Sequence, residues 1–175
     1  SGFLHGPEGI TTEGLKFVMD LKSKGGRISE FADKFNGKFH KDKRPWGVAC
    51  DVAIPSATQN EVSGDDAKTL IKNGCSAMIE AANMPCEPEA VDHFKEAGTL
   101  FAPSKAANAG GVAVSGLEMT QNSMRLSWTR DEVDEKLRNI MRDIHDKCVE
   151  YGSDGKHVNY MKGANVAGFK KVGDA

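Results

Sequence analysis

The sequence has no long apolar run, almost no net charge and no local concentration of cysteine. No stretch of its 175 residues approaches the roughly 20 consecutive apolar residues that cross a bilayer, so we expect no transmembrane helix. The 23 basic and 25 acidic residues leave a formal net charge of -2, which gives no electrostatic reason to expect nucleic acid or an anionic membrane as partner. A small molecule is therefore the partner that we expect.

The four cysteines are widely spaced and include no Cys-x-x-Cys pair. This distribution differs from the dense framework of small disulfide-bonded domains and indicates reduced thiols. The residues after Ser1 have no signal-peptide layout. We therefore expect a soluble, cytoplasmic protein.

Several catalytic motifs are missing too. The chain has no His-Glu-x-x-His and no Gly-x-Ser-x-Gly, so nothing indicates a hydrolase. His145 and Cys148 share one face of a predicted helix, but two ligands do not make a zinc site, and we expect no metal. The Gly-x-Gly-x-x-Gly turn of dinucleotide-binding folds is also absent.

The chain before residue 105 mixes helices with short apolar strands, and its apolar content of 39% is enough for one core. Helices predicted at residues 11–24 and 27–35 precede the basic stretch 38–44, which we interpret as a solvated loop. Strands then alternate with helices: strands at 48–54, 76–81 and 99–102, and helices at 65–72 and 87–97. This alternation predicts βαβ units and a parallel sheet covered on both faces.

From Lys105 onward, no segment resembles a strand. Thr129 and Glu132 have the spacing of a capping box, and it opens a long helix. The apolar face of that helix consists of Val133, Leu137, Ile140, Met141, Ile144 and Cys148. A weaker helix is predicted at 159–170, so the C-terminal part is expected to be helical.

The loops after the three strands are the candidate site, because parallel sheets bind ligands beyond the carboxyl ends of their strands. Residues 55–61 crowd hydroxyl, amide and carboxylate groups, although Thr58 and Asn60 also suit caps or turns. Asn83 follows the second strand, with Pro85 restricting the chain behind it. Residues 103–116 are mostly small, which permits close approach of either a ligand or a neighbouring helix. These features alone name no substrate.

Four segments resemble, in order and spacing, the hexameric small-subunit glutamate dehydrogenases. They are Pro55-Ser56-Ala57-Thr58-Gln59-Asn60-Glu61, Ala81-Ala82-Asn83-Met84-Pro85, Lys105 through Met119, and Asn159-Tyr160-x-x-Gly163-Ala164-Asn165-Val166-Ala167-Gly168-Phe169. The resemblance implies an α/β, Rossmann-like three-layer fold whose parallel sheet lacks its first strands and is followed by C-terminal helices. It implies a partial dinucleotide-binding domain at residues 1–104 and a helical segment at 105–175 that packs on it.

The resemblance also implies that the chain begins just after the second strand of the nucleotide-binding domain. The glycine-rich turn would then precede Ser1. So would the substrate domain, which in this family holds the lysine and aspartate of the acid/base chemistry. We therefore expect no catalytic residue within this chain and no activity of the chain alone.

Carried over residue by residue, the resemblance implies a cofactor site with three parts. Ala57, Thr58 and Gln59 would line its adenosine side, Asn83 would meet the nicotinamide ribose, and Asn108 would approach the carboxamide. NADP is the cofactor that we expect from the resemblance, with NAD as the alternative.

The resemblance places Val112 and Ser115 at the glutamate pocket, with the Ser115 hydroxyl donating to the side-chain carboxylate of the substrate. Ala82 stands where the family pattern usually has glycine, and we expect its methyl group to shift the ribose contact at Asn83 slightly.

The implied reaction is the reversible oxidative deamination of L-glutamate to 2-oxoglutarate and ammonia, in a homo-hexamer. One alternative is a sister dehydrogenase acting on leucine, valine or phenylalanine. Ser115 favours glutamate over these, because a carboxylate needs a hydrogen-bond donor, whereas an apolar substrate leaves a buried hydroxyl unpaired. The other alternative is a non-catalytic nucleotide-binding or assembly module.

Overall fold

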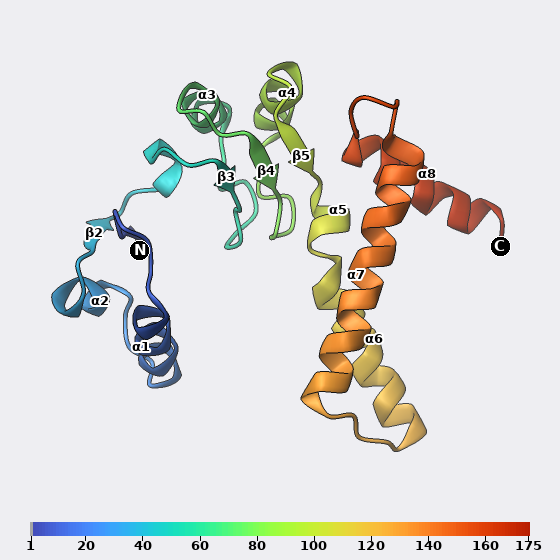
Figure 1. Ribbon diagram of the computed structural model, residues 1–175, viewed down its shortest axis with the longest axis horizontal. Coiled ribbons are helices and arrows are strands. Elements are labelled where there is room, and N and C mark those ends of the chain that lie inside the picture. Colours follow the sequence, from blue (N-terminus) through green and yellow to red (C-terminus); the bar gives the residue numbers. More distant parts are fainter. Residues whose placement is uncertain (1) are drawn as a thin grey trace. The chain divides into compact units, whose positions relative to one another are not determined.

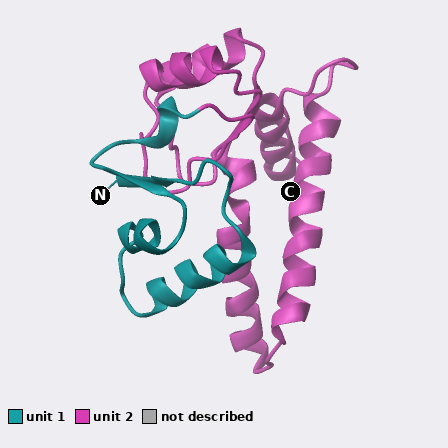
Figure 2. Cartoon of the chain, turned by 60° about the vertical axis from the view of Figure 1, so that its left-hand side comes forward, with its two compact units in different colours: residues 1–48 teal, residues 49–175 magenta. Residues whose placement is uncertain are grey.

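The computed structural model describes residues 2–175, and the chain divides into two compact units, residues 1–48 and 49–175 (Figure 2). Within residues 2–175, no helix is long and apolar enough to cross a membrane.

The unit formed by residues 1–48 is a two-stranded antiparallel ribbon with two helices between its strands. Strand β1 (Gly2–His5) pairs with β2 (Lys38–Lys41), so that Gly2 lies opposite Lys41. Helices α1 (Thr12–Ser23) and α2 (Ser29–Lys34) connect them, and the short 3-10 helix η1 (Pro45–Gly47) follows β2. Phe31 is buried, and its ring contacts those of Phe17 and Phe35.

Both helices predicted in this unit are confirmed, and the Thr11 hydroxyl caps α1 by accepting from the Gly14 backbone N–H at 3.1 Å. The prediction of a loop for the basic stretch 38–44 is wrong over Lys38–Lys41, which form β2. That strand exists because β1 supplies its backbone partners from more than thirty positions away in the sequence, as in the pairing of His5 with Lys38. The pattern of charges within the stretch gives no sign of this pairing.

The unit formed by residues 49–175 begins with the predicted parallel sheet, which is confirmed. Strands β3 (Val52–Ala53), β4 (Ala77–Ile79) and β5 (Leu100–Ala102) lie in the order β3-β4-β5. Helices α3 (Gly64–Lys72) and α4 (Pro88–Glu96) connect them and pack against each other (Figure 1). The core between these helices and the sheet consists of Val62, Ala67, Leu70, Met78, Ala90, Phe94 and Phe101.

Four helices complete this unit: α5 (Ser104–Ala107), α6 (Ala109–Met124), α7 (Arg130–Gly152) and α8 (Tyr160–Gly173). The predicted capping box opens α7, since the Thr129 backbone N–H donates to the Glu132 carboxylate at 2.7 Å and the Thr129 hydroxyl accepts from the Glu132 N–H. The predicted apolar face of α7 is half-buried from Val133 to Ile144 and buried at Cys148. Helix α7 packs against both α6 and α8, and α8 also contacts β5 (Figure 1).

Candidate functional site

The loops after β3 and β4 are joined to each other by backbone hydrogen bonds. The Asn60 N–H donates to the Met84 carbonyl at 3.0 Å, and the Val62 N–H donates to the Pro85 carbonyl at 2.9 Å. Asn60 and Met84 both have a left-handed backbone, with φ of 54° and 46°. Asparagine tolerates this conformation better than most residues, so its interpretation as a turn former agrees with the structure.

Asn83 and Asn108, which were predicted as two separate site residues, are brought together by the fold. Asn108 Nδ2 donates to Asn83 Oδ1 at 2.6 Å, across 25 positions of sequence. Asn83 is exposed and Asn108 is half-buried at the junction of α5 and α6. Within residues 2–175, no other hydrogen bond uses the side-chain nitrogen of Asn83 or the side-chain oxygen of Asn108, so the pair presents one amide donor and one acceptor to a ligand.

The predicted adenosine-side residues Ala57, Thr58 and Gln59 all lie exposed in the loop after β3. A carboxylate of the same loop orders the backbone here, because Glu61 Oε1 accepts from the Ala57 N–H at 2.8 Å and from the Thr58 N–H at 3.2 Å. The side chains of Thr58 and Gln59 therefore extend from a loop whose backbone is fixed by hydrogen bonds to its own residue Glu61.

Val112 and Ser115 lie three residues apart on α6, and both are exposed. The Ser115 hydroxyl donates to the Gly111 carbonyl at 3.3 Å, a long bond to its own helix. The small residues of this segment were expected to allow close approach of either a ligand or a neighbouring helix, and different glycines agree with each interpretation. A Cβ at Gly110 would press on Leu137 and Met141 of α7, whereas a Cβ at Gly111 or Gly116 would meet nothing within 4 Å. Gly110 therefore serves helix packing, and Gly111 lies on an open face.

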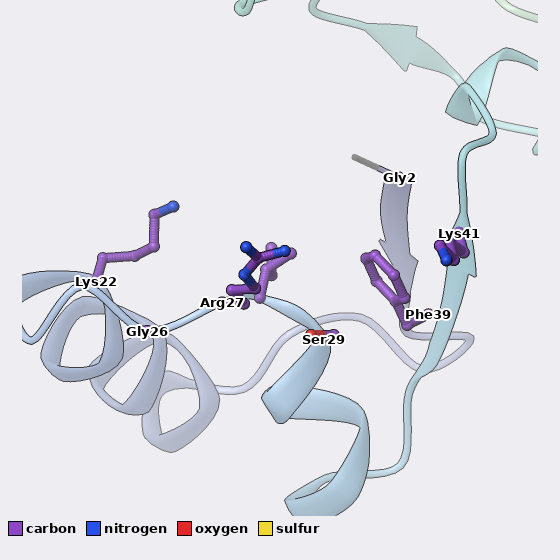
Figure 3. A pocket seen from close by; sticks show the side chains of 8 residues that line it. Gly2, Lys22, Gly26, Arg27, Ser29, Phe39 and Lys41 are labelled. Carbon is purple, nitrogen blue, oxygen red and sulfur yellow. The ribbon is translucent and has the colours of Figure 1, made fainter.

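Two of the pockets formed by residues 2–175 lie apart from the predicted site residues. One, of about 440 Å³ in the unit of residues 1–48, is lined by the cations Lys22, Arg27 and Lys41 (Figure 3). The other, of about 730 Å³, is bordered by α7 and α8. None of the predicted site residues lines either pocket. Ala57, Thr58, Gln59 and Asn83 are all exposed, so the strand-end loops present a polar surface, and the charge of the first pocket suits an anionic group.

Comparison of the sequence with known proteins identifies the family of this chain. All 175 residues match the family described as Glutamate/Leucine/Phenylalanine/Valine dehydrogenase. The chain belongs to this dehydrogenase family. A relative from Bacteroides thetaiotaomicron, named glutamate dehydrogenase, is 57% identical over 176 residues, which cover 99% of this chain and 40% of the relative. The NAD(P)-specific glutamate dehydrogenase of Xylanibacter ruminicola is 56% identical over 178 residues, which cover 100% of this chain and 40% of that protein.

The solved structures agree with the family assignment. The crystal structure of Plasmodium falciparum glutamate dehydrogenase matches with a TM-score of 0.92 and 47% identity, over 99% of this chain and 38% of that one. Other relatives in the dehydrogenase family are named NADP-specific or NAD-specific glutamate dehydrogenases. This chain therefore spans about two-fifths of the length of the curated relatives that it matches.

Sequence reasoning missed the charged groups that hold the loops of this dehydrogenase-family chain. Glu80 is buried, and its two carboxylate oxygens accept from the backbone N–H groups of Cys86 and Ser104. Burial raises the pKa of the Cys86 thiol, and the Glu80 carboxylate beside it raises that pKa further, so the thiol stays protonated. Lys105 Nζ also donates to Asn165 Oδ1 of α8 at 2.6 Å. The signal that the sequence offered was an acidic residue within the apolar strand predicted at 76–81.

Proposed function

We propose that this chain is the part of an NAD(P)-dependent glutamate dehydrogenase that binds the coenzyme and the glutamate side chain. The observation that carries the proposal is the Asn83–Asn108 amide pair, which lies at the strand ends where parallel α/β sheets bind their ligands. The matches to relatives named glutamate dehydrogenase cover 99–100% of this chain, and these names support glutamate as the substrate of the parent protein.

The residues present fit a nicotinamide dinucleotide. The open donor of Asn83 and the open acceptor of Asn108 complement ribose hydroxyls and a carboxamide, both of which donate and accept hydrogen bonds. The exposed polar groups of Thr58 and Gln59 suit the adenosine side. The bound coenzyme supplies the hydride chemistry, while the residues of this chain bind and orient it. Both NADP and NAD appear in the names of the relatives, and we propose NADP as the preferred coenzyme.

Ser115 and Val112 are the proposed contacts to the glutamate side chain. The hydroxyl of Ser115 is exposed, and its 3.3 Å bond to Gly111 is long enough to be exchanged for a shorter bond to a carboxylate. Acid/base groups are proposed to lie in the remainder of the parent protein, so the chain alone should bind ligands without turning them over. A homo-hexameric parent is part of the same proposal, and light scattering of the full-length protein measures it.

The substrate assignment is tested by Ser115→Val in the full-length protein. Loss of a hydrogen bond to a charged group costs about 1.5–3 kcal/mol, so kcat/KM for glutamate should fall by roughly 10- to 100-fold. Turnover of leucine, valine or phenylalanine, however slow, should fall less. Ser123→Val, at an exposed serine further along α6, is the matched control and should leave both unchanged. Equal losses on glutamate and on the apolar amino acids would contradict the glutamate assignment.

A non-catalytic module is the second class of function, and coenzyme titration distinguishes it. The full-length protein is titrated with NADPH and with NADH while protein fluorescence is recorded. Saturable binding of at least one of them is the expected result. Absence of binding for both would leave the Asn83–Asn108 pair without its proposed ligand and would refute the enzyme proposal.

A further inference from the structure

Glu80 is a buried carboxylate directly after β4, with only 5% of its surface exposed. Its backbone N–H donates to the Ala102 carbonyl at 3.0 Å, beside the pairing of Ile79 with Ala102 in the sheet. Glutamate is almost never buried unless its carboxylate has partners, because the charge loses its hydration. The partners of this carboxylate therefore indicate why it is buried.

The two carboxylate oxygens of Glu80 reach two different loops. Oε2 accepts from the Ser104 backbone N–H at 2.8 Å, and Oε1 accepts from the Cys86 backbone N–H at 3.3 Å. The thiol of Cys86 lies near the same carboxylate, which raises the pKa of that thiol. Cys86 follows Asn83 closely in the second loop, and Ser104 shortly precedes Asn108 in the third. A single side chain thus joins the two segments that carry the amide pair.

We infer that Glu80 is a positioning residue that holds Asn83 and Asn108 in the relative placement that the coenzyme requires. The inference rests on the proposed function. The amide–amide bond itself lies at an exposed position, where water competes for both partners. The bonds to Glu80 involve an acceptor side chain that is only 5% exposed, and hydrogen bonds of charged groups in such surroundings are stronger. Glu80 is therefore the firmer of the two connections between the loops.

Two substitutions remove this connection in different ways. Glu80→Gln keeps the shape of the side chain but replaces one acceptor oxygen with an amide that faces an N–H donor. Ser104→Pro keeps the carboxylate and removes the N–H that it binds. Proline is well tolerated at Ser104, since this is the first residue of α5 and the preceding Pro103 already has the extended backbone, with ψ of 150°, that proline demands.

The experiment measures the steady-state kinetics of the full-length protein with NADPH, 2-oxoglutarate and ammonia. Glu80→Gln and Ser104→Pro should each raise the KM for NADPH about tenfold, which corresponds to about 1.4 kcal/mol. The KM for 2-oxoglutarate should change by less than about twofold. Two matched controls should keep wild-type KM values for both: Ser104→Ala, which retains the N–H, and Glu89→Gln, at an exposed glutamate of α4.

A purely structural role for Glu80 predicts a different pattern, in which the unfolding temperature and the active fraction fall while the KM for NADPH stays unchanged. That pattern, an equal rise in both KM values, or failure of both variants to fold would each overturn the inference. An inactive wild-type protein would instead refute the proposed reaction. In that case the dissociation constant for NADPH is measured for wild type and for the two variants, and both variants should bind NADPH more weakly. Equal dissociation constants in all three proteins, or no binding of NADPH by wild type, would overturn the inference.

Discussion

The Asn83–Asn108 hydrogen bond predicts a measurable coupling between the two residues in coenzyme binding. At 2.6 Å it is a short bond between neutral amides, and such bonds contribute about 0.5–1.5 kcal/mol net. Its exposure favours the lower half of that range. Replacing either residue with alanine removes both the bond and the proposed contact of that residue with the coenzyme. Each single variant should therefore lose more free energy of coenzyme binding than the bond alone contributes.

A double-mutant cycle isolates the bond. The dissociation constant for NADPH is measured by fluorescence titration for wild-type full-length protein, Asn83→Ala, Asn108→Ala and the double variant. Because the second substitution has no bond left to remove, the loss in the double variant should be smaller than the sum of the single losses by about 0.5–1 kcal/mol. A control cycle of Asn83→Ala with Asn139→Ala, on the exposed side of α7, should be additive. Additivity of the first cycle as well would refute the view that the two amides act as a unit.

Two predictions concern the stability of the chain itself, measured by urea unfolding. A Cβ at Gly163 would collide with the Cys148 carbonyl of α7, so Gly163→Ala should lower the free energy of unfolding by about 1–3 kcal/mol. A Cβ at Gly168 would meet nothing within 4 Å, so Gly168→Ala should leave the free energy of unfolding unchanged or raise it by up to about 1 kcal/mol. Equal effects of the two would contradict the packing argument. The hydrogen bonds from Thr129 hold the pKa of Glu132 below its ordinary 4.5, so its stabilisation is complete above that pH and is lost as the pH falls through the lowered pKa. Glu132→Gln should therefore be less stable than wild type at neutral pH, and the difference in their free energies of unfolding should shrink as the pH falls. A difference that did not shrink would be inconsistent with this capping role.

Elements with local determinants were predicted from the sequence, and elements that depend on distant partners were not. Helix α7 was predicted because Thr129 and Glu132 satisfy each other within one turn. Strands β1 and β2 were missed, since neither is rich in β-branched residues and each exists only through pairing with the other. The strand predicted at 48–54 is shorter in the structure, where β3 pairs only with β4 and is limited to Val52–Ala53.

The same distinction applies to the site. The rule that parallel sheets bind ligands at the carboxyl ends of their strands predicted the loops that carry Asn83 and Asn108, whereas the choice of these two residues came from the family resemblance. Glu80 was missed because hydrophobic patterning assigns acidic residues to solvent, and its burial depends on two N–H groups that come from other loops. The division of the chain at residue 104 stays a prediction, although residues 49–175 form one compact unit.

The position of Asn108 is set by two anchors that no local window of sequence contains. Ser104, just before it, is bound by Glu80 from 24 positions upstream, and Lys105 is bound by Asn165 from 60 positions downstream. The Lys105 bond is exposed, and exposed contacts of a flexible lysine contribute about 1 kcal/mol or less. The Glu80 bonds are buried and charge-assisted, so they should dominate. The Glu80 carboxylate, more than the contact of Lys105 with α8, should therefore fix where the amide of Asn108 meets that of Asn83.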